Sequence, residues 1–432
     1  MSGTCAAGTA NPVTLDRDEI IAWHRRHLST GRTWLAELSG GQLETASAGA
    51  RVWAQDTEYL DCGGYGVFIL GHRHPRVTEA VIAQIHRHPM ATRLLLEPTA
   101  AIAAQALVQV APAGLERVHF VNSGAEAVEA AIKFARAAGR TRLISAIGGY
   151  HGKTMGALSL TARKFYQDPF RPLLPGVAHV GYGDSAALEQ CLAGSSQPAA
   201  VFIEPVQGEG GVIVPPDGYL REVARLCREH GALFVLDEVQ TGLGRLGTWW
   251  GADREGITPD LLLVGKNLSG GVIPVAAVLS TEEIYRPFSD DPLLHTSTFA
   301  ASPVAMAAAA TTIDVLRDEH LIPTAERLGR LIVSTLRDLL ERYAPHLNVK
   351  VRGLGLLIGL ELPSPHVTGD LVLELQSQRV LVNHSLNAST VLRLTPPAVL
   401  TEADLHWLFT SFTTALRAVG ERHSHPIMER IS

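Results

Sequence analysis

The chain has 432 residues, of which 46% are hydrophobic, and its formal net charge at pH 7 is −6. This length and apolar content are enough for a large core and more than one domain. The mild acidic excess, without a block of basic residues, gives no reason to expect a nucleic acid as a partner.

The cysteines and the apolar segments indicate the cellular compartment in which we expect the protein. The four cysteines show no CxxC spacing, so we expect no disulfide framework and no metal centre, and a cytoplasmic location is the natural expectation. The N-terminus lacks the pattern of a secretory signal, and no apolar stretch is long enough to cross a bilayer. We therefore expect no membrane association.

In chain order, the pattern first predicts a helix over residues 20–38 and a hairpin over residues 51–64. From residue 76 onward, amphipathic helices such as 76–88 and 98–111 alternate with short apolar runs. These runs are residues 117–122, 141–146, 199–205, 232–238 and 259–265. Continuous runs of Val, Leu, Ile and Phe are typical of strands buried on both faces. The alternation predicts an α/β fold with a mainly parallel sheet flanked by helices.

The pattern changes near residue 318. A long amphipathic helix over residues 324–343 precedes strand-like segments at 349–362 and 391–397. We therefore expect three parts: residues 1–75 as the N-terminal segment of a small domain, residues 76–317 as a large domain, and residues 318–432 as the C-terminal small domain.

Ligands of parallel sheets bind at the carboxyl ends of the strands, so the residues after each run are informative. Ser123 follows the first run and can cap a helix, with Glu126 completing a capping box. The start of this helix, with Gly124 beside it, is suited to bind a phosphate. The alternative is a capped helix without a ligand. This loop fits neither GxxxxGK nor GxGxxG, which weakens mononucleotide and nicotinamide binding.

Two further loops carry candidate side chains. In 148-GGYHGKT-154, Tyr150 and His151 can lie flat against a planar ligand, although a glycine-rich turn with a packed tyrosine is the alternative. Glu204 and Glu209 follow the third run, where solvated loop charges are the alternative. Each loop alone is weak evidence for a site.

Asp237 and Lys266 end successive apolar runs. A desolvated carboxylate favours a cationic partner, such as a protonated ring nitrogen, unless Asp237 forms a salt bridge or caps a helix. Burying an unpaired ammonium is costly, so Lys266 either reaches solvent or uses its amine for chemistry. A phosphate seat, a flat aromatic ring, an aspartate and an imine-forming lysine together meet the needs of pyridoxal 5′-phosphate (PLP).

The motifs NSGAEA, YHGKT, EPVQGEGG, DEVQTGLGR, GK, HTSTF and LRLTPP occur in this order. Between Trp53 and Pro397 the chain resembles the class III (ornithine, acetylornithine and 4-aminobutyrate type) PLP-dependent aminotransferases. The segments GYHGKTMGALSLTA, PFRPLLPG, GVIVPPDGYL and QRVLVNHSLN are most similar to the putrescine (diamine) aminotransferases. The resemblance implies fold type I, with a seven-stranded type of sheet in a large PLP-binding domain and a small α+β domain. It also implies a homodimer with shared active sites and leaves open whether dimers pair into tetramers.

The resemblance implies roles for individual residues. Lys266 would bind PLP as a Schiff base and move the proton, Asp237 would pair with the pyridine nitrogen, and Glu204 would support the site. The other implied cofactor contacts are Ser123, Gly124 and Ala125 at the phosphate, Tyr150 and His151 at one ring face, Val239 at the other, Gln240 at the ring hydroxyl, and Thr298 at the phosphate of the neighbouring subunit.

The substrate residues implied by the resemblance are Glu209, Arg393 and Lys153. Arg393 would bind the carboxylate of 2-oxoglutarate or glutamate, and Glu209 would mask it when the amine donor is bound. Lys153 replaces the arginine of the HGRT motif of ornithine-type members, and a lysine is poorly suited to clamp a carboxylate. This favours an amine or a diamine as the donor. Ser269 and 298-TFAASP-303 also depart from the glycine-rich family pattern.

The sequence therefore predicts an ω-aminotransferase that moves a terminal amino group between a putrescine-like diamine and a 2-oxo acid, 2-oxoglutarate or pyruvate, by a ping-pong mechanism. Two alternatives within the family remain: amination of a long-chain or polyketide-derived aldehyde, and an acetylornithine or ornithine type of activity. An aminomutase or decarboxylase would use the same PLP site. A nucleotide-binding or scaffold protein would require every polar group at a strand end to be incidental.

Overall fold

The computed structural model describes residues 16–38 and 40–424. These residues fall into two units. The smaller one contains the residues up to Ala46 together with Val52–Tyr59, and the larger one contains Ser47–Arg51 and the residues from Leu60 onward. Within the described ranges, no helix combines the length and the apolar character needed to cross a membrane.

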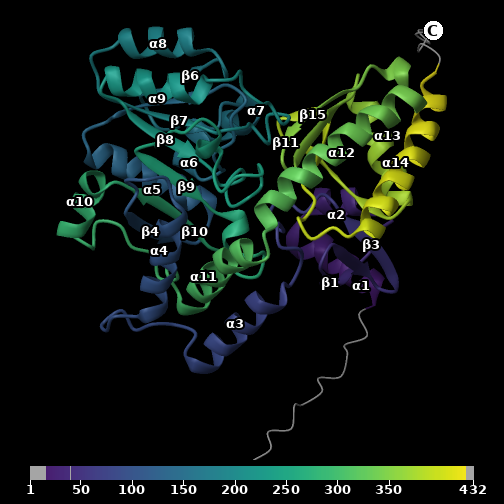
Figure 1. Ribbon diagram of the computed structural model, residues 1–432, viewed down its shortest axis with the longest axis horizontal. Coiled ribbons are helices and arrows are strands. Elements are labelled where there is room, and N and C mark those ends of the chain that lie inside the picture. The colour runs from purple at the N-terminus through teal and green to yellow at the C-terminus, as the bar shows by residue number, and fades with distance from the viewer. Residues whose placement is uncertain (1–15, 39, 425–432) are drawn as a thin grey trace, which may run out of the picture. The chain divides into compact units, whose positions relative to one another are not determined.

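The larger unit contains a seven-stranded sheet with the strand order β4-β10-β9-β8-β7-β5-β6 (Figure 1). Neighbouring strands from β6 to β9 are parallel, whereas β10 runs antiparallel to β9 and β4. The carboxyl ends of β5, β7, β8 and β9 therefore lie at one edge. The strands are β4 (Arg117–Val121), β5 (Arg142–Ala146), β6 (Val177–Val180), β7 (Ala199–Ile203), β8 (Leu233–Asp237), β9 (Leu261–Val264) and β10 (Ala276–Ser280).

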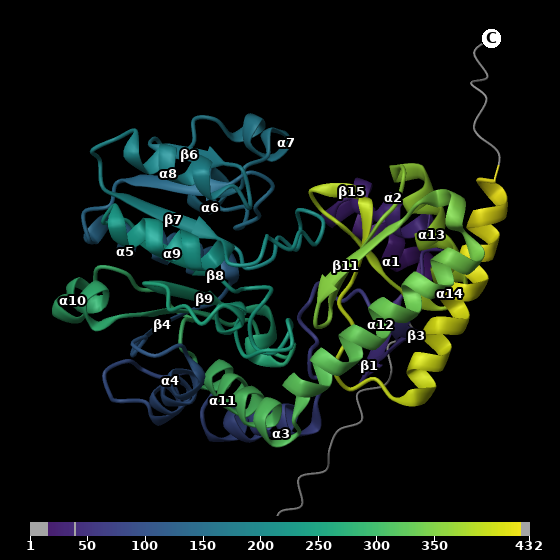
Figure 2. The ribbon, with the colours of Figure 1, turned by 45° about the horizontal axis from the view of Figure 1, so that its top comes forward.

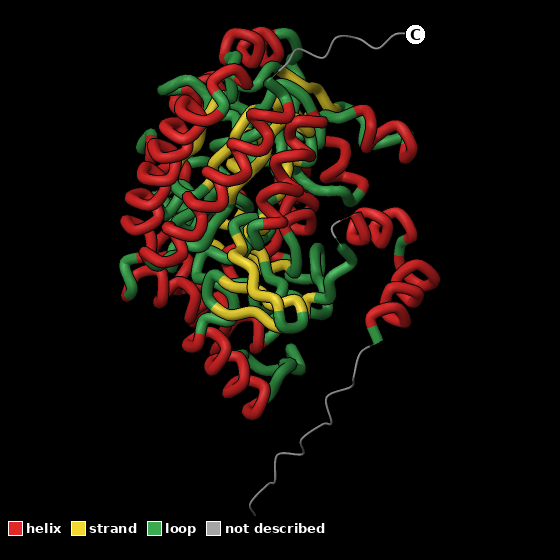
Figure 3. Tube along the Cα trace, turned by 90° about the vertical axis from the view of Figure 1, so that its right-hand side faces the viewer, coloured by secondary structure: helices red, strands yellow, loops and turns green. Residues whose placement is uncertain are grey.

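Helices cover both faces of this sheet because successive strand residues point to opposite sides. In β9, Leu261 and Leu263 belong to one apolar core and Leu262 and Val264 to the other. Figure 3 shows these strands in yellow among red helices. The first core contains α5 (Gly124–Ala137), α6 (Met155–Leu160) and α10 (Glu282–Asp290), and the second contains α3 (Pro75–Arg87), α4 (Pro98–Val110), α8 (Ser185–Ala193), α9 (Tyr219–Glu229) and α11 (Pro303–Asp318).

The C-terminal part of the larger unit is built on a four-stranded antiparallel sheet, in the order β11-β12-β15-β14. Figure 2 shows helices α12 and α14 side by side next to this sheet. In addition, β13 (Val380–Leu381) pairs in parallel with Leu60 and Asp61. The elements are α12 (Leu321–Tyr343), β11 (Lys350–Leu354), β12 (Leu357–Glu361), α13 (Pro365–Ser377), β14 (Asn383–Ser385), β15 (Ala388–Leu394) and α14 (Glu402–Arg422).

The remaining elements are short. In α1, the side chain of Asp16 caps the helix by accepting hydrogen bonds from the backbone N–H groups of Asp18 and Glu19. These elements are α1 (Arg17–Trp23), the π-helix η1 (His24–Leu28), α2 (Thr30–Leu38), β1 (Glu44–Ala48), β2 (Arg51–Ala54), β3 (Thr57–Asp61), α7 (Lys164–Gln167), and the 3₁₀-helices η2 (Asp168–Phe170), η3 (Gly251–Arg254), η4 (Lys266–Ser269) and η5 (Pro345–Leu347).

The predicted α/β fold with a mainly parallel sheet is confirmed. Two details differ from the sequence expectation. The single helix expected over residues 20–38 is divided by the π-helical segment His24–Leu28. Strands β6 and β10 were not predicted, because β6 is a short edge strand of Val177–Val180 and β10 follows the glycine-rich turn after η4 without an intervening helix.

Candidate active site

A cavity of about 220 Å³ lies at the carboxyl ends of β7, β8 and β9. It gathers residues from loops that are far apart in the sequence, and all of them except Gly152 were singled out by sequence analysis. Its lining residues are Gly124, Ala125, Tyr150, His151, Gly152, Lys153, Glu204, Asp237, Val239, Gln240 and Lys266.

Lys266 begins η4, two residues after the end of β9. Its φ of +42° lies in the left-handed region, which costs a non-glycine residue about 1–3 kcal/mol. The chain thus leaves the strand through a strained turn at the residue whose amine lines the cavity. Burial lowers the pKa of Lys266, so a larger fraction of its amine is neutral and able to act as a nucleophile or a base.

Asp237 and His151 form a buried pair beside Lys266. Nδ1 of His151 lies 2.7 Å from Oδ2 of Asp237, and Oδ1 of Asp237 accepts a hydrogen bond from the backbone N–H of Val239 at 3.1 Å. Burial alone would lower the pKa of His151, but the hydrogen bond and charge of Asp237 outweigh it and raise that pKa. A positively charged imidazole stabilises the carboxylate form of Asp237, which can then pair with a cationic ring nitrogen.

Glu204 follows β7 and accepts a hydrogen bond from the backbone N–H of Tyr150 at 2.8 Å. Burial raises the pKa of Glu204 to about 7, although the charge of His151 opposes this effect. The carboxyl group therefore changes its charge near neutral pH, inside the pocket that contains Lys266.

The loop before α5 has only half of the predicted capping box, because Ser123 caps the helix but the Glu126 carboxylate bonds the backbone N–H of Asn122 and not that of Ser123. Oγ of Ser123 accepts from the backbone N–H of Glu126 at 3.2 Å, and the Glu126 carboxylate accepts from the backbone N–H of Asn122 at 2.9 Å. The first N–H groups of a helix have no acceptor within the helix. Ser123 and Gly124 border a second cavity of about 380 Å³, which also contacts Lys266, so this helix start is open to an anionic group.

The pocket residues fit PLP. A Cβ atom at Gly124 would lie 2.7 Å from Cγ1 of Val239, so only a glycine leaves space between the helix start and this side chain. Nε2 of Gln240 is buried and has no hydrogen-bond partner among the described residues. A buried donor of this kind is costly unless it meets an acceptor, and the oxygen of the hydroxyl group on the PLP ring is one. Lys266, Asp237, Gln240 and the start of α5 would hold the cofactor.

Tyr150 is half-buried at the pocket, and burial raises its pKa, with a further contribution from the charge of Glu209. Lys153, three residues later, places its ammonium 4.2 Å from the centre of the Tyr166 ring. This is a cation–π contact. Nearby, the guanidinium of Arg163 donates to the backbone carbonyl of Asn387. The ammonium of Lys153 is therefore held in place by the ring of Tyr166.

Glu209 and Arg393 form an ion pair, as the resemblance implies. Nη1 of Arg393 lies 2.5 Å from Oε1 of Glu209, and both side chains are buried. Oε2 of Glu209 accepts a hydrogen bond from the backbone N–H of Leu386 at 2.9 Å. Nε of Arg393 has no hydrogen-bond partner among the described residues, so the guanidinium keeps a donor for another acceptor.

Sequence reasoning missed the buried Arg245, which ends the motif DEVQTGLGR. Its Nη1 donates to the backbone carbonyls of Leu356 at 3.2 Å and Pro396 at 2.6 Å. Burial lowers the pKa of Arg245 to about 9, and the charge of Arg393 adds to this. The arginine joins the glycine-rich loop after β8 to the chain segments beside β12 and β15. The quoted motif was the only sequence signal for it.

Thr298 does not line the Lys266 cavity. It borders a separate cavity of about 420 Å³ together with Arg93. Nη2 of Arg93 donates to the backbone carbonyls of Ser297, Thr298 and Ala300, at 2.9 Å for Thr298 and 3.0 Å for Ala300. Ala301 has a φ of +56°, at a position where the family pattern has glycine. One guanidinium therefore holds a strained turn in place.

Comparison with known proteins agrees with this geometry. The model of the family described as "Aminotransferase class-III" matches residues 42–416. This range includes all the side chains discussed in this subsection and most of the chain.

Three solved structures are similar over almost their full length. Ornithine aminotransferase from Toxoplasma gondii, which has partial occupancy of PLP at its active site, is 33% identical, with 95% of this chain and 96% of that chain covered and a TM-score of 0.88. An (S)-enantioselective omega-transaminase from Thermomicrobium roseum is 29% identical, with coverages of 94% and 99% and a TM-score of 0.84. An omega-transaminase variant from Pseudomonas jessenii is 26% identical, with coverages of 90% and 96% and a TM-score of 0.83.

Proposed function

The chain belongs to the PLP-dependent class III aminotransferases, and on this premise we propose that it moves a terminal amino group from a putrescine-like diamine to a 2-oxo acid, 2-oxoglutarate or pyruvate. The proposed diamine donor rests on the contact between Lys153 and Tyr166. A planar guanidinium can clamp a carboxylate with two hydrogen bonds, whereas an ammonium held over a ring cannot. A donor without an α-carboxylate, such as a diamine, needs no such clamp.

PLP supplies an electron sink that stabilises negative charge on the substrate carbon bearing the amine. Lys266 has the central role in the protein. Its amine, with a pKa lowered by burial, removes the proton from that carbon and returns it later. Asp237, oriented by its contact with His151, would pair with the ring nitrogen of the cofactor. Glu204 keeps the loop of Tyr150 in position through its hydrogen bond to that backbone.

Glu209 and Arg393 allow one pocket to accept two kinds of substrate. While a diamine is bound, Glu209 neutralises Arg393 through their ion pair. When 2-oxoglutarate enters, Arg393 exchanges the Glu209 carboxylate for the distal carboxylate of the substrate. The burial of Arg393 supports this exchange, and so does its Nε, which has no hydrogen-bond partner within residues 16–38 and 40–424.

The proposal includes the assembly and the division of the chain. The active unit is a homodimer in which Thr298 reaches the phosphate at the site of the neighbouring subunit. Its separation from the Lys266 cavity within one chain supports this role. Residues 1–75 and 318–432 form the small domain, and residues 76–317 form the large one. The scattered cysteines support the cytoplasm as the proposed compartment.

An ornithine type of activity is the second candidate. Two structures of ornithine aminotransferase from Toxoplasma gondii are 33% and 32% identical to this chain, and each covers at least 95% of it. The position of Lys153 separates the two candidates, because ornithine carries an α-carboxylate and putrescine does not.

The test is a half-reaction without a 2-oxo acid. Purified PLP-loaded protein receives putrescine or ornithine alone, and the visible absorbance reports conversion to pyridoxamine phosphate. We expect rapid conversion by putrescine and slow conversion by ornithine. Lys153→Arg should accelerate the ornithine reaction by about tenfold or more, while Lys164→Arg, at an exposed position of α7, should leave both rates unchanged.

Faster conversion by ornithine than by putrescine, with no effect of Lys153→Arg, would replace the diamine proposal by the ornithine type. Lys266→Ala tests the chemistry itself. We expect turnover to fall by about a thousandfold or more, because the proton-transfer group is removed. Turnover near the wild-type rate would overturn the assigned role of Lys266.

A further inference from the structure

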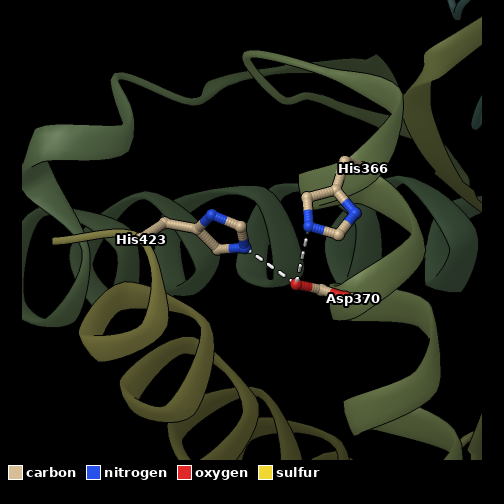
Figure 4. A group of neighbouring side chains, drawn as sticks. All are labelled: His366, Asp370 and His423. Carbon is tan, nitrogen blue, oxygen red and sulfur yellow. Dashed lines mark hydrogen bonds and ion pairs between the residues drawn. The ribbon is translucent and has the colours of Figure 1, made fainter. Parts of the chain in front are cut away.

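Two histidines and an aspartate meet at the ends of α13 and α14 (Figure 4). His366 and Asp370 lie on α13, and His423 follows α14 directly. Nε2 of His423 lies 2.8 Å from Oδ2 of Asp370, and Nε2 of His366 lies 3.9 Å from the same oxygen. One donor atom from each of the three side chains lies within 4.8 Å of the other two.

The two helices hold this cluster together. His366 and Asp370 are four residues apart, so they share one helix face. His423 is fixed at the C-cap of α14, where its backbone N–H donates to the carbonyls of Glu421 and Val419. The two imidazole rings meet edge to face, with centroids 5.4 Å apart. Figure 4 shows that one nitrogen atom of each imidazole ring is directed toward the carboxylate of Asp370.

The charges near the cluster also bear on what it can bind. Arg422 lies 3.3 Å from Oδ2 of Asp370 and 2.6 Å from Glu374. Burial would raise the pKa of Asp370, but hydrogen bonds from His423 and Arg422 outweigh this and lower it. With neutral imidazoles, the two carboxylates and the one guanidinium leave a net negative charge. Arg422 can stay paired with Glu374 if a second cation takes Asp370.

We propose that His366, Asp370 and His423 form a binding site for a divalent transition-metal ion of the zinc type. Two imidazole nitrogens and one carboxylate oxygen are a common ligand set for zinc, with water as the fourth ligand. Tetrahedral coordination with bonds of about 2.0 Å places the ligand atoms about 3.3 Å apart. Small side-chain rotations bring the three atoms to this spacing from their present distances. The metal would tie the end of α14 to α13, and this site is independent of the aminotransferase reaction.

The experiment uses the full-length PLP-loaded protein, freed of any affinity tag and dialysed against a chelator. Calorimetric titration with ZnCl₂ should show one site per chain with a micromolar dissociation constant. Mg²⁺ should not compete, because it prefers oxygen ligands. His366→Ala should weaken zinc binding by about tenfold or more, since second-shell changes alone already cost about 10–100-fold. His406→Ala, an exposed histidine of α14, is the matched control and should have no effect.

The variant Arg422→Ala distinguishes a metal site from a cluster that is only a salt bridge. Removing the guanidinium removes a competing cation from Asp370, so zinc should bind several-fold more tightly. His366 is 71% exposed, so loss of binding in His366→Ala is not a folding defect, and circular dichroism verifies this. Absence of zinc binding in the wild type, equal affinity in His366→Ala, or no tightening in Arg422→Ala would each overturn the three-residue site.

Discussion

Glu204 and His151 lie in the same buried pocket, but their pKa values are raised for different reasons. For Glu204 the cause is burial, which raises its pKa to about 7. For His151 burial acts in the opposite direction, and the contact with Asp237 raises the pKa. The consequence is that Glu204 titrates near neutral pH, while His151 is held in contact with Asp237.

This difference predicts a pH-dependent stability. An unfolded Glu204 ionises near its ordinary pKa of 4.5, whereas the folded one ionises near 7. The stability contributed by its protonated form is therefore complete below pH 4.5 and is lost as the pH rises through 7. Glu204→Gln cannot ionise, so its melting temperature should rise relative to wild type across this window.

Differential scanning calorimetry of both PLP-free proteins, at several pH values between about 4.5 and 8, measures the difference. The raised pKa of Glu204 corresponds to a difference in the free energy of unfolding of about 3 kcal/mol as an upper bound. A constant difference between the two melting curves at every pH would contradict the raised pKa of Glu204.

Single residues at strand ends were predictable, whereas their partners were not. Lys266 and Asp237 follow continuous apolar runs, and such runs identify buried strands whose carboxyl ends bind ligands. The contact between His151 and Asp237 joins residues 86 positions apart, and no local pattern encodes it. Arg245 was missed for the same reason, because its acceptor carbonyls lie 111 and 151 residues further along the chain.

At the scale of elements, the turn before α11 combines strain with a dedicated support. Ala301 adopts a φ of +56° where glycine would be relaxed, and Arg93, itself at a φ of +62°, donates to three carbonyls of the turn. The sequence showed that 298-TFAASP-303 departs from the family pattern. It did not show that an arginine about 200 residues earlier holds the turn.

Arg93→Lys should weaken PLP binding. A lysine ammonium cannot reach all three carbonyls from one planar group, so the turn that carries Thr298 loses its fixed position. Given the proposed contact of Thr298 with the cofactor phosphate, we expect the dissociation constant of PLP to rise about three- to tenfold, as measured by equilibrium dialysis. Arg87→Lys on α3 is the matched control, and equal PLP affinity in both variants would exclude the role of Arg93.

At the scale of the whole molecule, the C-terminal sheet supplies a residue to the site of the parallel sheet. Arg393 lies on β15, paired in register with Gly359 of β12 and Asn383 of β14. The antiparallel sheet therefore fixes the position of the guanidinium beside Glu209. The apolar patterns predicted the strand before Glu209 and the strand that contains Arg393. The pairing of the two side chains came only from the resemblance, because no local sequence pattern links residues so far apart.

Arg393→Lys should separate the two half-reactions. The substitution keeps the positive charge but removes the bidentate hydrogen bonding of a guanidinium group. The KM for 2-oxoglutarate should rise by about tenfold or more, while the putrescine half-reaction should change by less than about threefold. Stopped-flow measurement of each half-reaction tests this. Equal losses in both would mean that Arg393 supports the pocket structure and does not recognise the acceptor.

The backbone contacts of Glu209 bear on the timescale of the proposed exchange between Glu209 and 2-oxoglutarate at Arg393. Its backbone carbonyl accepts from the N–H of Asn387 at 2.9 Å, and Oγ of Ser385 donates to the carbonyl of Gly208 at 3.0 Å. These bonds hold the loop to the end of β14 and to the turn after it whichever way the carboxylate points. In the proposed exchange, only the side-chain torsions of Glu209 need to rotate, and side-chain rotation is far faster than loop or domain motion. The alternation between donor and acceptor then requires no slow conformational gate.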